Sequence, residues 1–155
     1  MKPIQFEARM LIGLNRALGE LAEQKTIPNK LSYWLMRISR EVVKEIETFE
    51  QARMKIIDKY ADKDEDGQYR TENDQYVIPD QAGYAAEFEE IAANPIEIRF
   101  NKVKVNLDEL DKRGVEISPE SYFYLDLIFD IEEETEAAEE AEEDSPVQIL
   151  EMKKD

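Results

Sequence analysis

The sequence contains no cysteine and no histidine. Without cysteine the chain can form no disulfide and no thiolate nucleophile, and it offers zinc no sulfur ligand. Without histidine it cannot carry a Ser-His-Asp triad or an imidazole general base. Enzyme chemistry would have to rely on carboxylates, lysine, tyrosine or a hard cation such as Mg²⁺. The composition therefore favours a protein that is not an enzyme.

Long apolar runs are also missing, although 42% of the residues are hydrophobic. No stretch approaches the roughly 20 apolar residues that a membrane-spanning helix needs. The opening segment MKPIQFEARMLIGL carries Glu7 and Arg9 inside its apolar run, which is not typical of a signal peptide. We therefore expect one globular domain with a modest core, located in the cytoplasm of the cell that makes it and without a membrane partner.

Positive charge is scarce, because 37 acidic residues against 20 basic ones give a net charge of −17. The excess is uneven: residues 130–155 hold 12 acids and 2 bases, which leaves 25 acids and 18 bases in residues 1–129. Phosphates would be repelled, so we expect no direct nucleic-acid binding. Residues 131–155 are predicted to form a flexible acidic tail, which could keep the protein soluble, engage a basic surface or imitate a nucleic acid.

Two amphipathic helices are predicted at the start of the chain, over about residues 4–24 and 29–60. Apolar residues recur in both at three- and four-residue spacing. Pro28 ends the first helix and suits the first turn of the second. The short connection predicts a long antiparallel hairpin over residues 1–61. The second helix is longer, so its half beyond Phe49 must pack against the C-terminal part or a second copy.

Residues 62–130 are predicted to form a small α+β part that packs on the hairpin, which gives a mainly α fold class with a minor α+β component. Two short strands would flank the turn TEND, and IEIRF at 96–100 alternates as a half-buried strand does. Asp80 and Ser118 are predicted to cap short helices. Val115 and Ile117 are expected in a brief strand. The expected buried face of the last helix comprises Tyr122, Leu125, Ile128 and Phe129.

The order of several phrases along the chain carries a resemblance. LNRALGELAEQK precedes LSYWLMRISREVVKEIETFEQARMKIIDKY, the break DKDEDG, NPIEIRF, GVEISP and an acidic end. Over about residues 8–133 this order resembles a group of small uncharacterised proteins encoded by tailed bacteriophages and prophages. The resemblance implies a phage protein made in the bacterial host cytoplasm, with association with the virion as a further expectation. It implies no activity and no functional residues.

The break after the second helix matches part of a calcium-binding loop. Asp62, Asp64 and Asp66 stand at positions 1, 3 and 5 of an EF-hand loop, and Gly67 stands at position 6. Position 12 is Asn73 instead of the bidentate glutamate, and a strand pattern follows instead of an exit helix. A charged turn at the end of a helix explains the same residues, and we favour it. Calcium is the single cofactor that the sequence suggests.

Three groups of apolar residues are candidates for contact with a protein partner. The first is Trp34, beside Tyr33 and Arg37, although closure of the hairpin end by Trp34 is the interpretation that we favour. The second lies on the overhanging half of the second helix, and the third follows the acidic run as a short docking motif. The candidates are Trp34, Phe49, Ile56, Tyr60, Val147, Ile149 and Leu150.

These features together predict a non-enzymatic phage protein that acts by binding a viral or host protein. A virion assembly factor, a chaperone and a minor structural component all fit this description, and a homo-oligomer is compatible with it. One alternative is an acidic inhibitor of a host nucleic-acid-binding or defence enzyme. Another is a weak calcium-binding module.

Overall fold

The computed structural model of the chain describes residues 2–132, so nearly all of the expected tail, with Val147, Ile149 and Leu150, lies outside the described residues. Helices form most of the described part, and the predicted mainly α class is confirmed. The helical elements are η1 (Ala8–Met10), α1 (Leu11–Ala22), α2 (Asn29–Tyr60), α3 (Gln81–Ala92), α4 (Leu107–Lys112) and α5 (Pro119–Leu125). The strands are β1 (Pro3–Glu7), β2 (Thr71–Glu72), β3 (Gln75–Tyr76), β4 (Pro95–Asn101), β5 (Val103–Asn106) and β6 (Phe129–Glu132).

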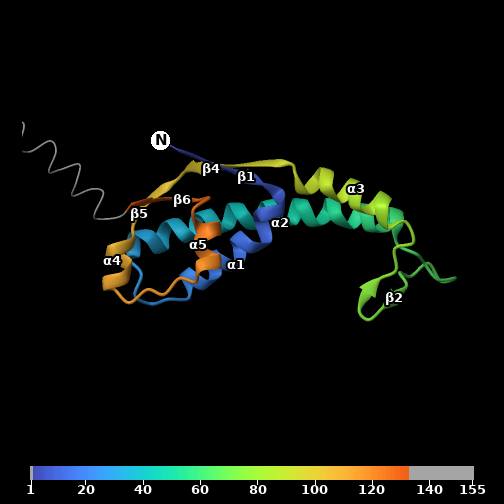
Figure 1. The fold of residues 1–155 in the computed structure, drawn as a ribbon, viewed down its shortest axis with the longest axis horizontal. Helices are drawn as coiled ribbons and strands as arrows, with labels where there is room; N and C mark the ends of the chain where they lie inside the picture. The colour runs from blue at the N-terminus through green and yellow to red at the C-terminus, as the bar shows by residue number, and fades with distance from the viewer. Residues whose placement is uncertain (1, 133–155) are drawn as a thin grey trace, which may run out of the picture.

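The long helix α2 forms the axis of an elongated molecule, and α1 runs beside its first half in the opposite direction (Figure 1). Both helices bury one apolar stripe, as their spacing predicts. The buried residues of the two stripes are Leu11, Leu14, Ala17, Leu18 and Leu21 on α1, and Leu31, Leu35, Ile38, Val42 and Ile57 on α2. Within residues 2–132 no helix is long and apolar enough to cross a membrane.

The first helix begins later than the sequence predicts, because residues 3–7 form strand β1. Ile4 and Phe6 are buried and alternate with exposed residues, which is the period of a strand. β1 pairs antiparallel with β4, with Ile4 opposite Ile98 and Phe6 opposite Ile96. The prediction of helix from residue 4 is therefore wrong, because the partner that stabilises the strand lies far away in the sequence.

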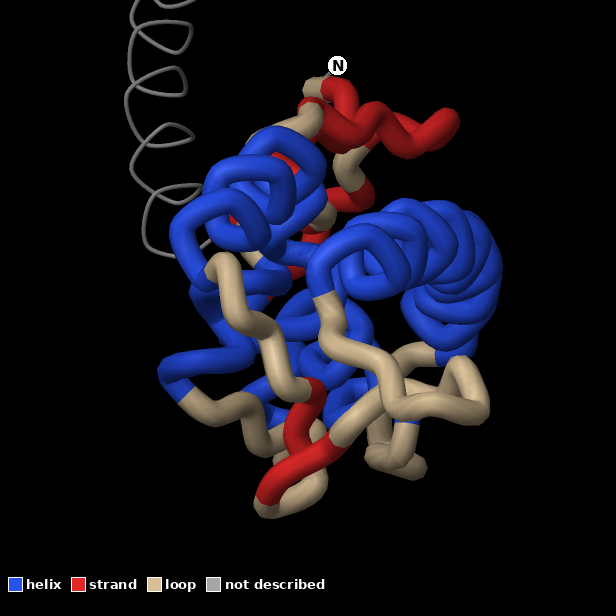
Figure 2. Tube along the Cα trace, turned by 90° about the vertical axis from the view of Figure 1, so that its right-hand side faces the viewer, coloured by secondary structure: helices blue, strands red, loops and turns tan. Residues whose placement is uncertain are grey.

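Two strand pairs, β1–β4 and β5–β6, lie end to end. β4 and β5 follow each other with Lys102 between them, and the Lys102 amide donates to the Lys2 carbonyl. β6 pairs with β5 in parallel, and Lys2 Nζ lies 3.0 Å from Asp130 Oδ1. The small β2–β3 pair forms a sheet of its own. It lies on the other side of the helices from β1 and β4 (Figure 1, Figure 2).

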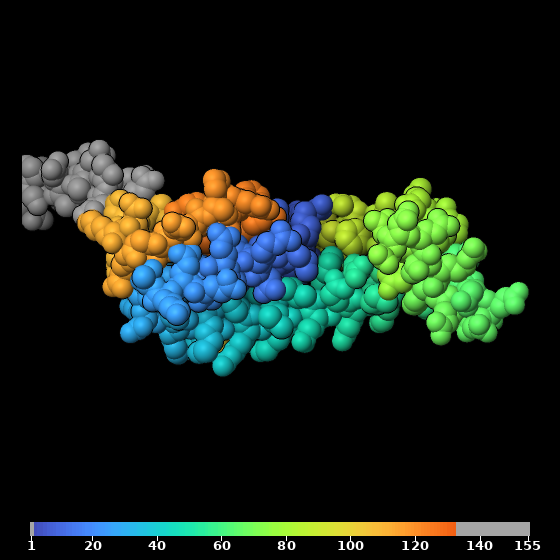
Figure 3. Space-filling view, turned by 90° about the horizontal axis from the view of Figure 1, so that it is seen from below, coloured from blue at the N-terminus to red at the C-terminus, as the bar shows by residue number. Residues whose placement is uncertain are grey.

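Helix α3 lies along the second half of α2, at the end of the molecule opposite α4 (Figure 1, Figure 3). The ring centroids of Phe49 and Phe88 are 6.0 Å apart, and those of Tyr60 and Tyr84 are 6.4 Å apart. The overhang therefore packs against a later part of the same chain, which is the first of the two predicted alternatives.

The C-terminal part differs from its prediction in three respects. Val115 and Ile117 lie in a loop and not in a strand. Val115 is buried, and its amide donates to the carbonyl of Leu110 in α4. Helix α5 ends at Leu125, and Phe129 opens strand β6. Tyr122 was expected in the core but is 37% exposed, because α5 turns Ser121 inward to bond Glu20 of α1.

Candidate functional site

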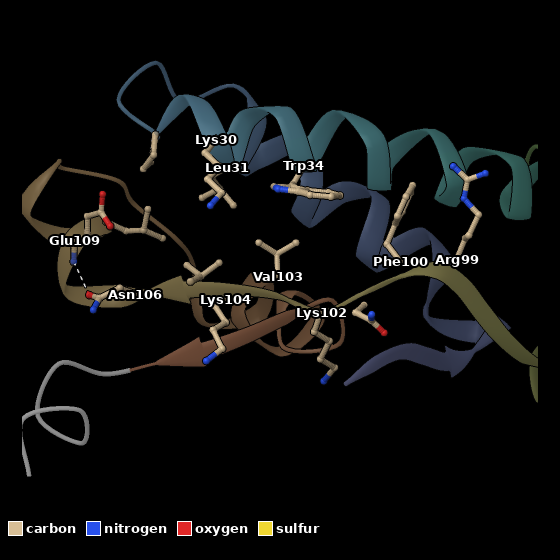
Figure 4. Close-up of a pocket in the computed structure, with 14 residues that line it drawn as sticks. Lys30, Leu31, Trp34, Arg99, Phe100, Lys102, Val103, Lys104, Asn106 and Glu109 are labelled. Carbon is tan, nitrogen blue, oxygen red and sulfur yellow. Dashed lines mark hydrogen bonds between the residues drawn. The ribbon is translucent and has the colours of Figure 1, made fainter. Parts of the chain in front are cut away.

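A pocket of about 710 Å³ opens between the first turns of α2, the consecutive strands β4 and β5, and α4. Figure 4 shows Leu31 and Trp34 reaching down from α2 toward Val103 and Phe100. Leu31 is buried, while Trp34, Phe100 and Val103 are half-buried and keep part of their surface in the opening. Leu110 of α4 completes the apolar wall. A preformed apolar concavity of this volume is typical of a binding site.

The aromatic wall of the pocket is held in a defined geometry. The rings of Trp34 and Phe100 meet edge to face at 5.9 Å with an interplanar angle of 72°. The guanidinium carbon of Arg37 lies 4.9 Å from the Phe100 centroid and 5.6 Å from the Trp34 centroid. Arg37 Nη1 also donates to the hydroxyl of Tyr33 at 2.9 Å. Trp34 thus packs against Phe100 of β4, and the guanidinium of Arg37 stabilises the positions of both rings.

The rim of the pocket is basic, in contrast to the acidic chain. Four of its lining residues carry a positive charge and Glu109 alone carries a negative one. Lys104 Nζ lies 3.1 Å from Glu132 Oε1, and Lys102 Nζ donates to the Asp126 carbonyl at 2.9 Å. In Figure 4 Lys102 and Lys104 point away from α2, on the outer face of β5, so the basic rim of the opening consists of Lys30 and Arg99. This rim favours ligands that combine negative charge with an apolar group.

The DKDEDG turn uses its carboxylates to hold its own shape. Asp64 Oδ1 accepts from the amides of Asp66 and Gln68 at 2.9 and 3.0 Å. Asp62 Oδ2 lies 2.9 Å from Arg70 Nη1. Within residues 2–132 no group of three or more acidic side chains is arranged to hold a metal ion. The structure therefore does not bring Asp62, Asp64 and Asp66 together as a ligand set.

The same turn is tied back to α2 through Asp58. Lys63 Nζ and the Tyr69 hydroxyl both donate to Asp58 Oδ1 at 2.8 Å. The Lys63 ammonium, and to a smaller extent the Tyr69 hydroxyl, hold the pKa of Asp58 below its ordinary value. Tyr69 stands where an EF-hand has an apolar residue, but here its hydroxyl bonds Asp58 and so links the turn to α2.

The candidate contact residues on the overhang lie apart from the pocket. Phe49, Ile56 and Tyr60 belong to the second half of α2, where all three are half-buried, and Phe49 and Tyr60 face α3. Lys59 Nζ bonds Glu87 Oε1 at 2.6 Å across this contact, which lowers the pKa of Glu87 together with a smaller contribution from Tyr60. The structure thus brings Trp34, but not these three residues, into the pocket.

Several pocket residues were missed from the sequence, above all Phe100, Val103 and the two lysines of KVKV. The alternation Lys102, Val103, Lys104, Val105 does carry a signal, since it places charge on one face of a strand and apolar groups on the other. The sequence could not show that α2 would cover the apolar face.

Comparison with known proteins gives no relative: no family model, no curated protein and no solved structure matches the chain.

Proposed function

We propose that this chain is a non-enzymatic phage protein that acts in the host cytoplasm by binding a segment of another protein in the pocket beside Trp34. The phage origin rests on the resemblance described above. The single observation that carries the binding site is an aromatic wall with a basic rim in a chain of net charge −17. An assembly factor, a chaperone or a minor virion component would work in this way.

The chemistry of the pocket defines the segment that it would accept. Trp34 and Phe100 offer partly exposed rings whose positions are already fixed, so binding would cost little ordering of side chains. Lys30 and Arg99 extend from opposite walls, α2 and β4, and both are exposed. We expect a segment with one large apolar side chain between acidic residues, because such a segment matches both features.

A differential pull-down tests this proposal. Full-length wild type, Trp34→Ala and Lys30→Glu would be used as baits in lysate from infected bacteria, and the captured proteins identified by mass spectrometry. Phe123→Ala is the matched control, since Phe123 is 58% exposed on α5 and does not line the pocket. We expect a phage protein that the wild type and the control retain and that both pocket variants lose.

Equal capture by all four baits would contradict the pocket as the binding site. The second candidate function, inhibition of a host nucleic-acid-binding or defence enzyme, is supported by the net charge of −17. It predicts a different result, in which a host enzyme is captured by all four baits and is released as salt screens the acidic surface.

A further inference from the structure

We propose that the C-terminal segment of this same chain, residues 145–152 (SPVQILEM), occupies the pocket beside Trp34 in the free protein and must be displaced by a partner. This inference rests on the proposed function, because it assigns a regulator to the same site. The acidic run before the segment, residues 133–144, would lie on the basic rim.

The path of the chain places the last described residue, Glu132, close to residues that line the pocket. β6 runs parallel to β5, and its last residue, Glu132, stands opposite Asn106. Asn106 lines the pocket, and so does Lys104, whose ammonium lies 3.1 Å from the Glu132 carboxylate. The acidic residue that immediately precedes the C-terminal run is therefore already paired with a lysine of β5, on the face of the strand away from α2 (Figure 4).

The length of the remaining chain allows its apolar patch to return to the pocket. Val147 follows Glu132 by 15 residues, since 147 − 132 = 15. A linker of that length spans at most about 50 Å when extended, at about 3.3 Å per residue. As a flexible coil its end-to-end distance is about 20 Å. Both distances suffice to reverse direction at Glu132 and reach the rings beside β5.

Charge complementarity supports the rim of this pocket as the place where the acidic run would lie. Residues 133–144 hold eight acids and no base. Residues 1–129 are themselves acidic, with 25 acids and 18 bases, so their net charge repels the run. The pocket rim carries Lys30 and Arg99 (Figure 4), with Glu109 as the one acid among the lining residues, so attraction is expected there. The apolar residues Val147, Ile149 and Leu150 then match the wall formed by Trp34 and Phe100.

A tethered segment would weaken partner binding by simple competition. A short flexible linker gives an effective concentration on the order of 1 mM. If the isolated segment binds with a dissociation constant of about 0.1 mM, the pocket is about 90% occupied and a competing ligand binds about tenfold more weakly.

Trp34 is the single tryptophan of the chain and lies in the pocket, so its fluorescence reports on occupancy. The experiment compares full-length wild type with a full-length variant carrying Ile149→Ser and Leu150→Ser. A control carries Ala137→Ser and Ala138→Ser, which alters the same tail without touching its apolar patch. We expect quenching of Trp34 by acrylamide to increase in the first variant and to stay unchanged in the control.

A synthetic peptide of residues 139–155 then measures the competition directly. We expect it to bind the Ile149→Ser/Leu150→Ser protein about tenfold more tightly than the wild type, with a change in Trp34 emission. Raising the salt from about 0.1 M to about 1 M shortens the Debye length from about 10 Å to about 3 Å and should weaken this binding.

Three results would overturn the inference. Equal affinity of the peptide for both proteins, or no binding to either, would show that the segment does not occupy the pocket. Protection of Trp34 from acrylamide could instead grow with protein concentration while light scattering shows a dimer. The segment would then occupy the pocket of a second copy and not its own. None of these results decides the proposed function, which fails only if Trp34→Ala and Lys30→Glu leave the pull-down unchanged.

Discussion

The ring of Tyr124 on α5 lies against the backbone of Gly13 on α1. A Cβ atom at position 13 would overlap the ring atoms Cζ and Cε1 of Tyr124. Gly19, further along the same helix, faces open space, with nothing within 4 Å of the place that a Cβ atom would take. The close approach of α5 to α1 therefore depends on one glycine and not on the other.

This contrast predicts opposite effects of the same substitution at two positions. Gly19→Ala should stabilise the protein by about 0.5–1 kcal/mol, because alanine is the better helix former. Gly13→Ala gains the same propensity but forces Tyr124 aside, and overpacking of this kind costs about 1–3 kcal/mol. Urea unfolding of both variants measures the difference. An equal gain at both positions would show that Tyr124 moves away without cost.

The elements that could be predicted from the sequence are those whose signals are local. Helix α2 spans residues 29–60 as predicted, because its apolar spacing and Pro28 lie within or beside the segment itself. The caps were also predicted correctly: the side chain of Asp80 accepts from the Gly83 amide, and that of Ser118 accepts from the Ser121 amide. Each of these interactions joins residues three positions apart.

The features that were missed depend on partners that are distant in the sequence. β1 exists because β4 pairs with it, and β6 exists because β5 does. Trp34 was expected to close the hairpin end against the first helix, but its ring meets Phe100 instead. The pocket follows from that contact, so the apolar spacing of α2 alone could suggest Trp34 but could not suggest the surface opposite it.

The stability of the α1–α5 contact should depend on pH through Glu20. The Ser121 hydroxyl donates to Glu20 Oε2 and the Ser118 amide donates to Oε1 at 3.2 Å. These bonds, the Ser121 hydroxyl most of all, hold the pKa of Glu20 below its ordinary value. A carboxyl whose pKa is lowered by folding stabilises the protein above its unfolded pKa and loses that contribution as the pH falls through the folded value.

We therefore predict that Glu20→Gln destabilises the protein at neutral pH and that the gap to wild type narrows as the pH falls below about 4.5, the ordinary pKa of a glutamate. The free energy of unfolding in urea, measured over a series of pH values, tests this. Glu23→Gln, just beyond the end of the same helix, removes the same charge from an exposed site and serves as the control. A gap that stays constant with pH would contradict the role assigned to Glu20.

Calcium should bind weakly to the DKDEDG turn. Asp62 is paired with Arg70, and one oxygen of Asp64 already accepts two amides, so a calcium ion would have to displace these partners. We predict a dissociation constant weaker than about 1 mM, beyond the range of extracellular calcium modules. Calorimetric titration measures it. Saturable binding below that value, lost in Asp62→Asn, would instead support the calcium-binding module.

The shape of the pocket wall should depend on the charge of Arg37. Its guanidinium carbon lies 4.9 Å from the Phe100 centroid and 5.6 Å from the Trp34 centroid. Arg37→Met keeps much of the length of the side chain but removes the cation, and partly desolvated cation–π contacts contribute about 0.5–2 kcal/mol. We expect lower stability in urea and a shift of Trp34 emission.

Two further variants separate this effect from a general loss of charge on α2. Arg40→Met removes a cation one turn away, where the guanidinium contacts Met36 Sδ at 3.9 Å and no ring of the pocket. Arg37→Lys keeps the charge but not the planar group that can face a ring and also bond the Tyr33 hydroxyl. If the cation positions the rings, Arg37→Lys should lie between wild type and Arg37→Met, and Arg40→Met should leave Trp34 emission unchanged. Equal shifts for Arg37→Met and Arg40→Met would mean that Trp34 responds to the charge of the helix and not to the guanidinium behind it.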